Sequence, residues 1–246
     1  MITGATSGIG RATARYFAQH GVGLILCGRR QDRLEALKKE LGQWVRVHIL
    51  NFDVRSRQAV FAALESLPTD FPEIDVLINN AGNAHGLDPI QDGDPDDWDA
   101  MIDINVKGLL YVSKAVIPQM VARQSGQIIN IGSIAAKEVY PNGNVYCASK
   151  HAVDAITQGM RMDLNPHGIR VGAIHPGLVE TEFSEVRFKG DRERASQVYQ
   201  GYRPLTGEDL AGLIYYMVSC PAHVNIADLV VLPTAQGSAT QVKKQP

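Results

Sequence analysis

The chain alternates short apolar runs with longer segments in which apolar residues recur every three or four positions. The runs rich in Val, Ile and Leu predict buried strands at 22–27, 45–50, 74–79, 127–132, 169–174 and 227–232. The periodic segments predict helices at 9–20, 31–41, 56–66, 97–123, 145–165 and 207–219. Strands that are apolar on both faces are typical of a parallel sheet covered by helices. The alternation therefore predicts one α/β domain over residues 1–246, with a doubly wound, Rossmann-type parallel sheet flanked by helices.

The two ends of the chain depart from this regular pattern. Only Met1 and Ile2 precede the glycine-rich segment, where a doubly wound fold places its central first strand. Either the first strand is very short here or the natural start lies upstream of Met1, and we expect the latter. The final segment "GSATQVKKQP" is polar, so a loose tail is expected from about residue 236.

Composition excludes several classes of partner. A net charge of -2 and a pI near 6.4 give no general basic field, so no nucleic-acid partner is expected. The apolar runs are too short to span a bilayer and no export signal is present, so no membrane partner is expected. Cys27, Cys147 and Cys220 lack CxxC spacing, which favours reduced thiols in a cytoplasmic protein. The scattered histidines predict no metal site.

A glycine-rich segment opens the first predicted helix. In "TGATSGIG", Gly4, Gly8 and Gly10 permit a tight turn and let a pyrophosphate approach the backbone closely. The N–H groups at the start of the following helix are unpaired and favour an anion. The alternative is a plain strand-to-helix turn. Because the segment opens a βαβ unit, a dinucleotide site is favoured.

The end of the next predicted strand indicates which dinucleotide binds. An NAD site usually has a carboxylate there for the ribose 2′-hydroxyl, whereas this chain has Arg29 and Arg30. A guanidinium forms a bidentate fork with a 2′-phosphate. The alternative is a solvated basic helix start. The arginines favour NADP (NADPH) as the cofactor.

"YCASK" places a phenol and an ammonium on one helical face, because Tyr146 and Lys150 are four residues apart. A free tyrosine has a pKa near 10. An ammonium about 4 Å away at an effective dielectric of ~20 favours phenolate by roughly 4 kcal/mol, which brings the pKa near neutrality. The alternative is an ordinary amphipathic helix that carries a tyrosine.

Together with "NNAG" at 79–82, "NVKG" at 105–108, Ser133 and "PG" at 176–177, these motifs resemble the short-chain dehydrogenase/reductase family. The likeness runs from Thr3 to about Pro233. "GNVYCASK" and "TEFSEVRFKGD" are similar to segments of the NADP-dependent 3-hydroxy acid dehydrogenases, a branch that includes enzymes oxidising serine.

The resemblance implies a set of cofactor contacts along the whole chain. Asp53 matches the residue that holds the adenine ring, residues 79–82 match the loop under the adenine ribose, and Val179 and Thr181 match contacts to the carboxamide. The residues expected to bind the cofactor are Gly4, Thr6, Ser7, Gly8, Ile9, Gly10, Arg29, Arg30, Asp53, Val54, Asn79, Ala81, Gly82, Tyr146, Lys150, Pro176, Gly177, Val179 and Thr181.

Four residues match the family's catalytic tetrad, namely Asn105, Ser133, Tyr146 and Lys150. Ser133 by itself also fits a turn or helix cap. Asn105 interrupts a helical pattern, where asparagine is unfavourable, so we expect a kink that holds water for a proton relay. The alternative is an exposed surface asparagine.

The substrate is expected to contact Ser133, Tyr146 and Arg187. The resemblance places a mobile substrate loop near 180–205, and within it the Arg187 fork suits a carboxylate. Lys189 is the second candidate, and a solvated charged loop is the alternative for both.

The resulting hypothesis is an NADP-dependent oxidoreductase that acts on a small 3-hydroxy acid such as serine. A reductase of a larger ketone or acyl thioester, and a dinucleotide-binding sensor without turnover, are the alternatives. The family resemblance also implies a homotetramer, with the helices at 97–123 and 145–165 at one interface.

Overall fold

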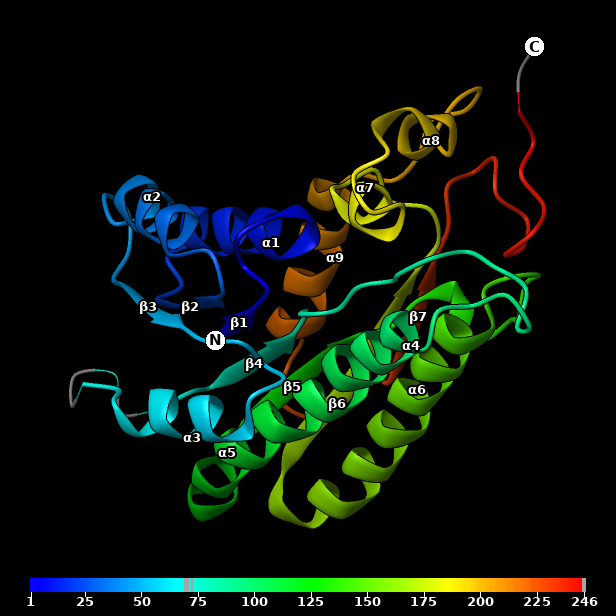
Figure 1. The fold of residues 1–246 in the computed structure, drawn as a ribbon. Helices are drawn as coiled ribbons and strands as arrows, with labels where there is room; N and C mark the ends of the chain where they lie inside the picture. Colours follow the sequence, from blue (N-terminus) through cyan, green and yellow to red (C-terminus); the bar gives the residue numbers. More distant parts are fainter. Residues whose placement is uncertain (69–70, 72, 245–246) are drawn as a thin grey trace.

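A computed structural model describes residues 1–68, 71 and 73–244 of the chain. Its centre is a seven-stranded, all-parallel sheet in the order β3-β2-β1-β4-β5-β6-β7 (Figure 1). The strands are β1 (Ile2–Thr3), β2 (Leu24–Gly28), β3 (Val47–Asn51), β4 (Val76–Asn79), β5 (Gly126–Ile131), β6 (Ile169–Pro176) and β7 (Asp228–Val231). The predicted doubly wound fold is confirmed, and the central strand has only two residues.

Helices cover both faces of the sheet. The helices are α1 (Gly8–Gln19), α2 (Gln31–Leu41), α3 (Arg57–Glu65), α4 (Pro95–Ile102), α5 (Leu109–Arg123), α6 (Asn144–Leu164), α7 (Phe183–Arg187), α8 (Arg192–Gln197) and α9 (Gly207–Ser219). Figure 1 shows α1, α2 and α9 on one face, α3, α5 and α6 on the other, and α7 and α8 beyond the sheet edge. Within the described residues, no helix has the length and apolar character needed to cross a membrane.

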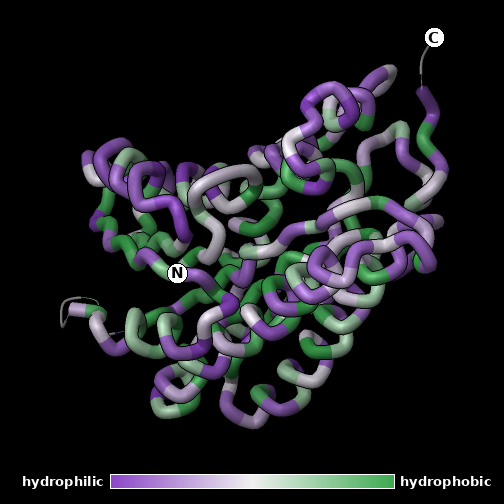
Figure 2. The backbone as a smooth tube through the Cα atoms, in the orientation of Figure 1, coloured by the Kyte–Doolittle hydropathy of each residue, from purple (hydrophilic) through white to green (hydrophobic). Residues whose placement is uncertain are grey.

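The core consists of two apolar layers, one on each side of the sheet. Successive strand residues point to opposite faces, so Ile25 packs on the α3–α5 side while Leu24 and Leu26 pack on the α1–α9 side. Each fully buried Leu or Ile side chain contributes roughly 1.5–3 kcal/mol. Figure 2 shows the hydrophobic backbone positions concentrated in the strands and the hydrophilic ones on the outer helices.

The helix predicted over 97–123 is wrong as a single α-helix. The chain forms α4, then a π-helical turn over Asp103–Gly108, then α5. Asp94 caps α4 by accepting a hydrogen bond from Asp96 N, and Pro95 occupies the first turn. The π-helical turn contains Asn105, so the interruption falls at the residue whose low helix propensity predicts it.

The segment after residue 236 is held against the fold through residue 243. Gln236 is 5% exposed and accepts a hydrogen bond from Leu178 N, while Ala239 N donates to Glu138. Lys243 N donates to Ala235 O. The segment expected to be a loose tail from about 236 therefore makes specific contacts over this stretch, with the loop after β6, with Glu138 before α6 and with Ala235. Residues 245–246 lie outside the described part.

Candidate functional site

A cavity of about 690 Å³ lies at the carboxyl edge of the sheet. Its lining comes from the turn after β1, the ends of β2, β4, β5 and β6, the start of α6, and the segment that includes α7. Ligand sites in open parallel sheets form at this edge, because the loops that leave the strands converge there. The cavity therefore gathers side chains that are far apart in the sequence.

The glycine turn after β1 forms one end of the cavity. Gly4 and Gly8 have φ values of +64° and +50°, a left-handed conformation that strains other residues. A Cβ on Gly10 would lie 2.5 Å from Gly4 O, so Gly10 closes the turn from behind. Ser7 precedes α1 with extended backbone and no capping bond from its side chain. The first N–H groups of α1 therefore remain available to a ligand.

The arginines after β2 are bound to neighbouring side chains. Arg30 donates to Thr6 Oγ1 at 2.9 Å and to Ser7 Oγ at 2.8 Å, which joins it to the glycine turn. Arg29 contacts Asp53 at 3.4 Å. Burial alone would raise the pKa of Asp53, but hydrogen bonds from Arg55 and the charge of Arg29 hold it below its ordinary value. Both predicted arginines thus line the cavity beside the glycine turn.

The loop after β4 is placed as expected except for its first residue. Ala81 and Gly82 line the cavity. The side chain of Asn79 instead donates to Ser113 Oγ and Asn130 Oδ1 at 2.9 Å each, in the core below. This corrects the expected side-chain contact: strand alternation turns Asn79 toward α5. Asn80, which follows it, lines the cavity and donates to Thr3 O.

Three tetrad residues, Ser133, Tyr146 and Lys150, line the cavity, and Asn105 lies buried behind the loop after β4. Ser133 hydrogen-bonds to the Tyr146 hydroxyl, and Lys150 Nζ donates to Ile131 O at 3.0 Å. A Cβ on Gly82 would lie 3.1 Å from Asn105 Oδ1 and 3.5 Å from Lys150 Nζ, so the loop after β4 packs closely against both side chains.

Asn105 is 2% exposed and holds the loop after β4 to the π-helical turn. Its Oδ1 accepts from Asn83 N at 2.9 Å, and its Nδ2 donates to Asn83 O and to Ser149 Oγ. The exposed-surface alternative for Asn105 is therefore wrong.

The expected lowering of the Tyr146 pKa by Lys150 is wrong in this arrangement. Burial raises the pKa of Tyr146 above its ordinary value, and Arg187 and the bond to Ser133 oppose this only in part. Lys150 Nζ lies 6.0 Å from the centre of the Tyr146 ring and bonds to the backbone. Burial also lowers the pKa of Lys150 to about 8.

Arg187 and Lys189, the two candidates for the substrate anion, differ in their surroundings. Arg187 lines the cavity with its Cζ 5.0 Å from the centre of the Tyr146 ring, and its Nη2 donates to the Tyr140 hydroxyl at 2.6 Å. Its buried Nε has no hydrogen-bond partner among the described residues. Lys189 is paired with Asp97 at 3.0 Å and with Asp94. The geometry therefore favours Arg187.

The segment after β6 lines the cavity opposite the tetrad, with Pro176, Gly177, Val179 and Thr181. A Cβ on Gly177 would lie 2.2 Å from Gln236 Oε1, so this glycine lets the C-terminal segment reach the cavity. A Cβ on Gly8 would lie 3.2 Å from Thr181 Cβ, which shows how closely this segment approaches the glycine turn.

Comparison with known proteins accords with this geometry. The family model for short chain dehydrogenases matches residues 1–192. The chain belongs to the short-chain dehydrogenase family. That membership accounts for a glycine turn, an Asn/Ser/Tyr/Lys group and a parallel sheet in one molecule.

Curated relatives within the family match nearly the full chain. Sulfoacetaldehyde reductase 2 of Chromohalobacter salexigens is 47% identical over 96% of this chain and 94% of its own. The NADP-dependent 3-hydroxy acid dehydrogenase YdfG of Escherichia coli K12 is 46% identical over 97% and 96%. A solved structure of the closed form of serine dehydrogenase complexed with NADP+ matches with a TM-score of 0.93. It is 46% identical and covers 97% of this chain and 96% of that one.

The sequence does not predict several residues at the cavity, among them Tyr140, Glu182 and Gln236, which line it, and Arg33, which binds Glu182. Arg33 donates to Glu182 at 2.7 Å. It lies three residues after Arg30, on the same face of α2, and this spacing is a signal that could have identified it. The other three reach the site only through folding, and no local pattern marks them.

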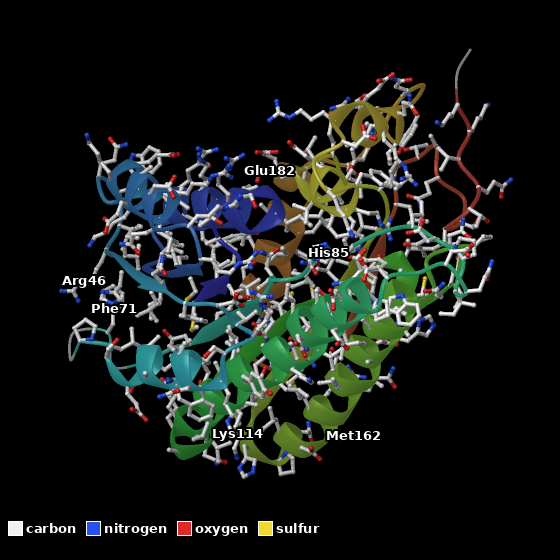
Figure 3. The ribbon with its side chains drawn as sticks, viewed as in Figure 1. Arg46, Phe71, His85, Lys114, Met162 and Glu182 are labelled. Atoms are coloured by element: carbon white, nitrogen blue, oxygen red, sulfur yellow. The ribbon has the colours of Figure 1, made fainter. Side chains whose placement is uncertain are left out.

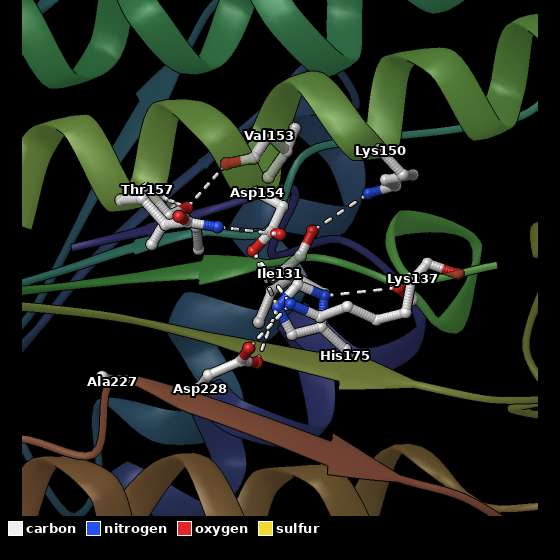
Figure 4. A network of polar contacts seen from close by, with 12 residues as sticks. Ile131, Lys137, Lys150, Val153, Asp154, Thr157, His175, Ala227 and Asp228 are labelled. Atoms are coloured by element: carbon white, nitrogen blue, oxygen red, sulfur yellow. Dashed lines mark hydrogen bonds and ion pairs between the residues drawn. The ribbon is translucent and has the colours of Figure 1, made fainter.

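A polar network lies directly below the Ser133 turn (Figure 4). His175 is fully buried, with Nδ1 3.3 Å from Ser133 O and Nε2 3.1 Å from Asp228 Oδ1, the latter without hydrogen-bond geometry. Lys137 Nζ lies 3.1 Å from Asp154 and 2.7 Å from Asp228. Burial and the Lys137 charge lower the pKa of His175. The lysine already supplies the cation for these carboxylates, so the network supports the turn rather than a metal.

Proposed function

We propose that this chain is an NADP-dependent oxidoreductase that transfers a hydride between NADP(H) and a small 3-hydroxy acid such as serine. One observation carries the proposal: the Arg187 guanidinium lies beside the catalytic tyrosine, with its Cζ 5.0 Å from the centre of the Tyr146 ring. The hydroxyl of the same tyrosine is hydrogen-bonded to Ser133. When the carboxylate of a small hydroxy acid binds Arg187, the hydroxyl of the same molecule, a few bonds from the carboxylate, would lie beside the Tyr146 oxygen. The names of the relatives, a 3-hydroxy acid dehydrogenase and a serine dehydrogenase, support the same substrate class.

The residues at the other end of the cavity fit the cofactor. The left-handed turn at Gly4 and Gly8 leaves room that side chains would fill, and the start of α1 faces it. Arg30, fixed by Thr6 and Ser7, supplies a fork for a 2′-phosphate. When bound, the nicotinamide ring accepts or supplies the hydride. Lys150 and the segment that includes Val179 and Thr181 would hold the nicotinamide half.

The tetrad residues manage the proton. In reduction the Tyr146 hydroxyl donates its proton to the carbonyl oxygen of the substrate. In oxidation the phenolate form of Tyr146, whose own proton has passed to solvent, accepts the hydroxyl proton of the substrate. Ser133 Oγ donates to the reacting oxygen and keeps it beside Tyr146. Asn105 acts through the backbone of Asn83 and positions the loop after β4.

The lining near Arg187 selects a small anion. Tyr140 and Phe183 flank the guanidinium, with each ring centre 5.7 Å from Cζ, which limits the space for a bulky ketone or acyl thioester. The unpaired Nε offers a charge-assisted hydrogen bond to a carboxylate. A sulfonate accepts hydrogen bonds in the same way, and the relative named sulfoacetaldehyde reductase 2 makes a short sulfonated aldehyde the second candidate substrate.

A substrate panel tests this proposal through NADPH absorbance. L-Serine, 3-hydroxypropionate, sulfoacetaldehyde, neutral alcohols of the same length and a bulky ketone are compared with NADP(H) and NAD(H). We expect Arg187→Ala to raise KM for the anionic substrate about 10- to 100-fold, because a charged hydrogen bond is lost. Neutral alcohols should change little. Lys189→Ala is the matched control, since Asp94 and Asp97 already pair that lysine. Equal losses on charged and neutral substrates would remove Arg187 from this role.

Tyr146→Phe separates an enzyme from a dinucleotide sensor. The substitution deletes the oxygen that exchanges the proton and keeps the buried ring. We expect turnover to fall by about 10²- to 10⁴-fold while the Kd for NADPH, measured by fluorescence, stays within about threefold. Wild-type protein that binds NADPH but turns over no compound of the panel would instead favour the sensor.

We also propose a homotetramer in the cytoplasm. Leu110 on α5 and Met162 on α6 are 40% and 70% exposed, and these apolar side chains support an interface on the two helices expected to form one. The described thiols Cys27, Cys147 and Cys220 are all free, which supports a reducing compartment.

A further inference from the structure

Glu182 forms an ion-pair cluster with two arginines on the other side of the cavity mouth. Its Oε2 accepts from Arg30 Nη1 at 2.9 Å, and its Oε1 accepts from Arg33 Nη1 at 2.7 Å. The glutamate is separated from these arginines by about 150 residues in the sequence. Figure 3 shows Glu182 beside α7, on the side that faces α1. The contact therefore connects the loop after β6 to the segment after β2.

Arg30 is the arginine that joins this cluster to the glycine turn. Its remaining donors bind Thr6 and Ser7, and all four residues line the cavity. All three nitrogens of Arg30 thus donate hydrogen bonds, to two hydroxyl oxygens and one carboxylate. Burial alone would raise the pKa of Glu182, but hydrogen bonds from Arg33 and Arg30 lower it, so the group is an anion at neutral pH.

A carboxylate and a phosphate compete for the same guanidinium groups, because each presents a pair of anionic oxygens that accepts forked hydrogen bonds. A cofactor without a 2′-phosphate has no group that replaces Glu182 on the arginines. A cofactor that has one exchanges one ion pair for another. Arg30 and Arg33 therefore already bind an anion of the chain itself, the Glu182 carboxylate.

We propose that Glu182 is a specificity-determining residue, which occupies the 2′-phosphate position on Arg30 and Arg33 and is displaced by the phosphate of the cofactor; this rests on the proposed use of NADP. Arg33 thereby becomes a phosphate ligand in addition to Arg29 and Arg30. Glu182 immediately precedes α7, which carries Arg187, so its release also frees the start of the segment that binds the substrate. Phosphate binding and substrate-loop position are linked through one side chain.

Binding of two nucleotides that differ only in the 2′-phosphate tests the proposal without turnover. Isothermal titration calorimetry of the full chain compares adenosine 2′,5′-bisphosphate with 5′-AMP. In Glu182→Gln we expect the bisphosphate to bind about three- to tenfold more tightly than in wild type, because its competitor has lost its charge. The Kd for 5′-AMP should stay within about twofold.

Glu185→Gln is the matched control. Glu185 lies on α7, three residues after Glu182, but it pairs with the exposed Arg192 at 2.8 Å. Glu185→Gln removes one negative charge, as Glu182→Gln does, and should leave both affinities unchanged. Glu182→Ala is a second variant, expected to act in the same direction as Glu182→Gln. Thermal unfolding of each variant confirms that it folds.

The outcomes separate this inference from the proposed function. An unchanged or weaker bisphosphate affinity in both Glu182 variants overturns the competition, even if the wild type prefers the bisphosphate and NADP use stands. An equal gain in Glu185→Gln also overturns it, because charge alone would then explain the effect. A wild type that binds 5′-AMP as well as the bisphosphate refutes NADP preference itself, and this inference with it.

Discussion

At the residue scale, burial shifts the pKa values of Tyr146 and Lys150 in opposite directions and so separates them. It raises the first, with the nearby Tyr140 adding to the effect, and it lowers the second to about 8. Each group is thus held more easily in its neutral form than it would be in water. Lys150 still carries a proton at neutral pH, and Arg187 adds a second positive charge nearer to the Tyr146 ring. Anion binding to Arg187 and proton transfer at Tyr146 are therefore coupled electrostatically.

The buried lysine is expected to reduce the stability of the fold. In the folded chain Lys150 loses its proton near pH 8, whereas its ordinary pKa is 10.5, so between these values the unfolded chain binds more protons and stability rises with pH. Lys150→Met removes this penalty. We expect the free energy of unfolding at pH 7 to rise by about 1–3 kcal/mol, with a gain about 1 kcal/mol smaller at pH 9. Urea denaturation at the two pH values measures it.

Lys114→Met provides the control for that measurement. Lys114 is exposed on α5 (Figure 3), so its removal should change the free energy of unfolding by less than about 0.5 kcal/mol. A net loss of stability in Lys150→Met would show that the bond to Ile131 O outweighs the cost of burying the ammonium.

At the element scale, the sequence predicts the strands and long helices because many positions along each of them must be apolar to be buried. Parallel strands covered on both faces, such as β5, must be apolar along their length, and this pattern can be read locally. The π-helical turn cannot be located in this way, since the apolar period of α4 and α5 continues through it. Only Asn105, a poor helix former, indicates the interruption.

The same distinction separates the site residues that the sequence predicts from those that it misses. The glycine turn and Tyr146 lie where a strand or loop leads into a helix, so short motifs identify them. Glu182 and Gln236 owe their positions to contacts with Arg30 and Leu178, far away in the chain. The short helices α7 and α8 are likewise predicted only as a loop near 180–205, because helices of this length depend on tertiary contacts.

At the scale of the whole molecule, the cavity and the exposed apolar residues lie on different parts of the surface. The cavity opens at the carboxyl edge of the sheet, beneath α7 and α8, whereas Leu110 and Met162 lie on the outer helices α5 and α6. Met162 points outward near the end of α6 in Figure 3. Trp44, which is 52% exposed, is another exposed large apolar side chain, and it lies outside α5 and α6. An assembly through α5 and α6 would leave the cavity open.

Sedimentation velocity tests the proposed tetramer directly. We expect wild-type protein to sediment with the mass of four 26.8-kDa chains. Met162→Glu places a charge in the α5–α6 interface, where burial without a partner costs several kcal/mol, so it should shift the protein to smaller species. Trp44→Glu, just after the end of α2, introduces the same charge at an exposed apolar position outside that interface and should leave the mass unchanged.

A monomeric wild type would refute the assembly, and a tetrameric Met162→Glu would place the interface on other helices. Because the cavity is complete within one chain, smaller species should retain cofactor binding, which links this test to the calorimetry above.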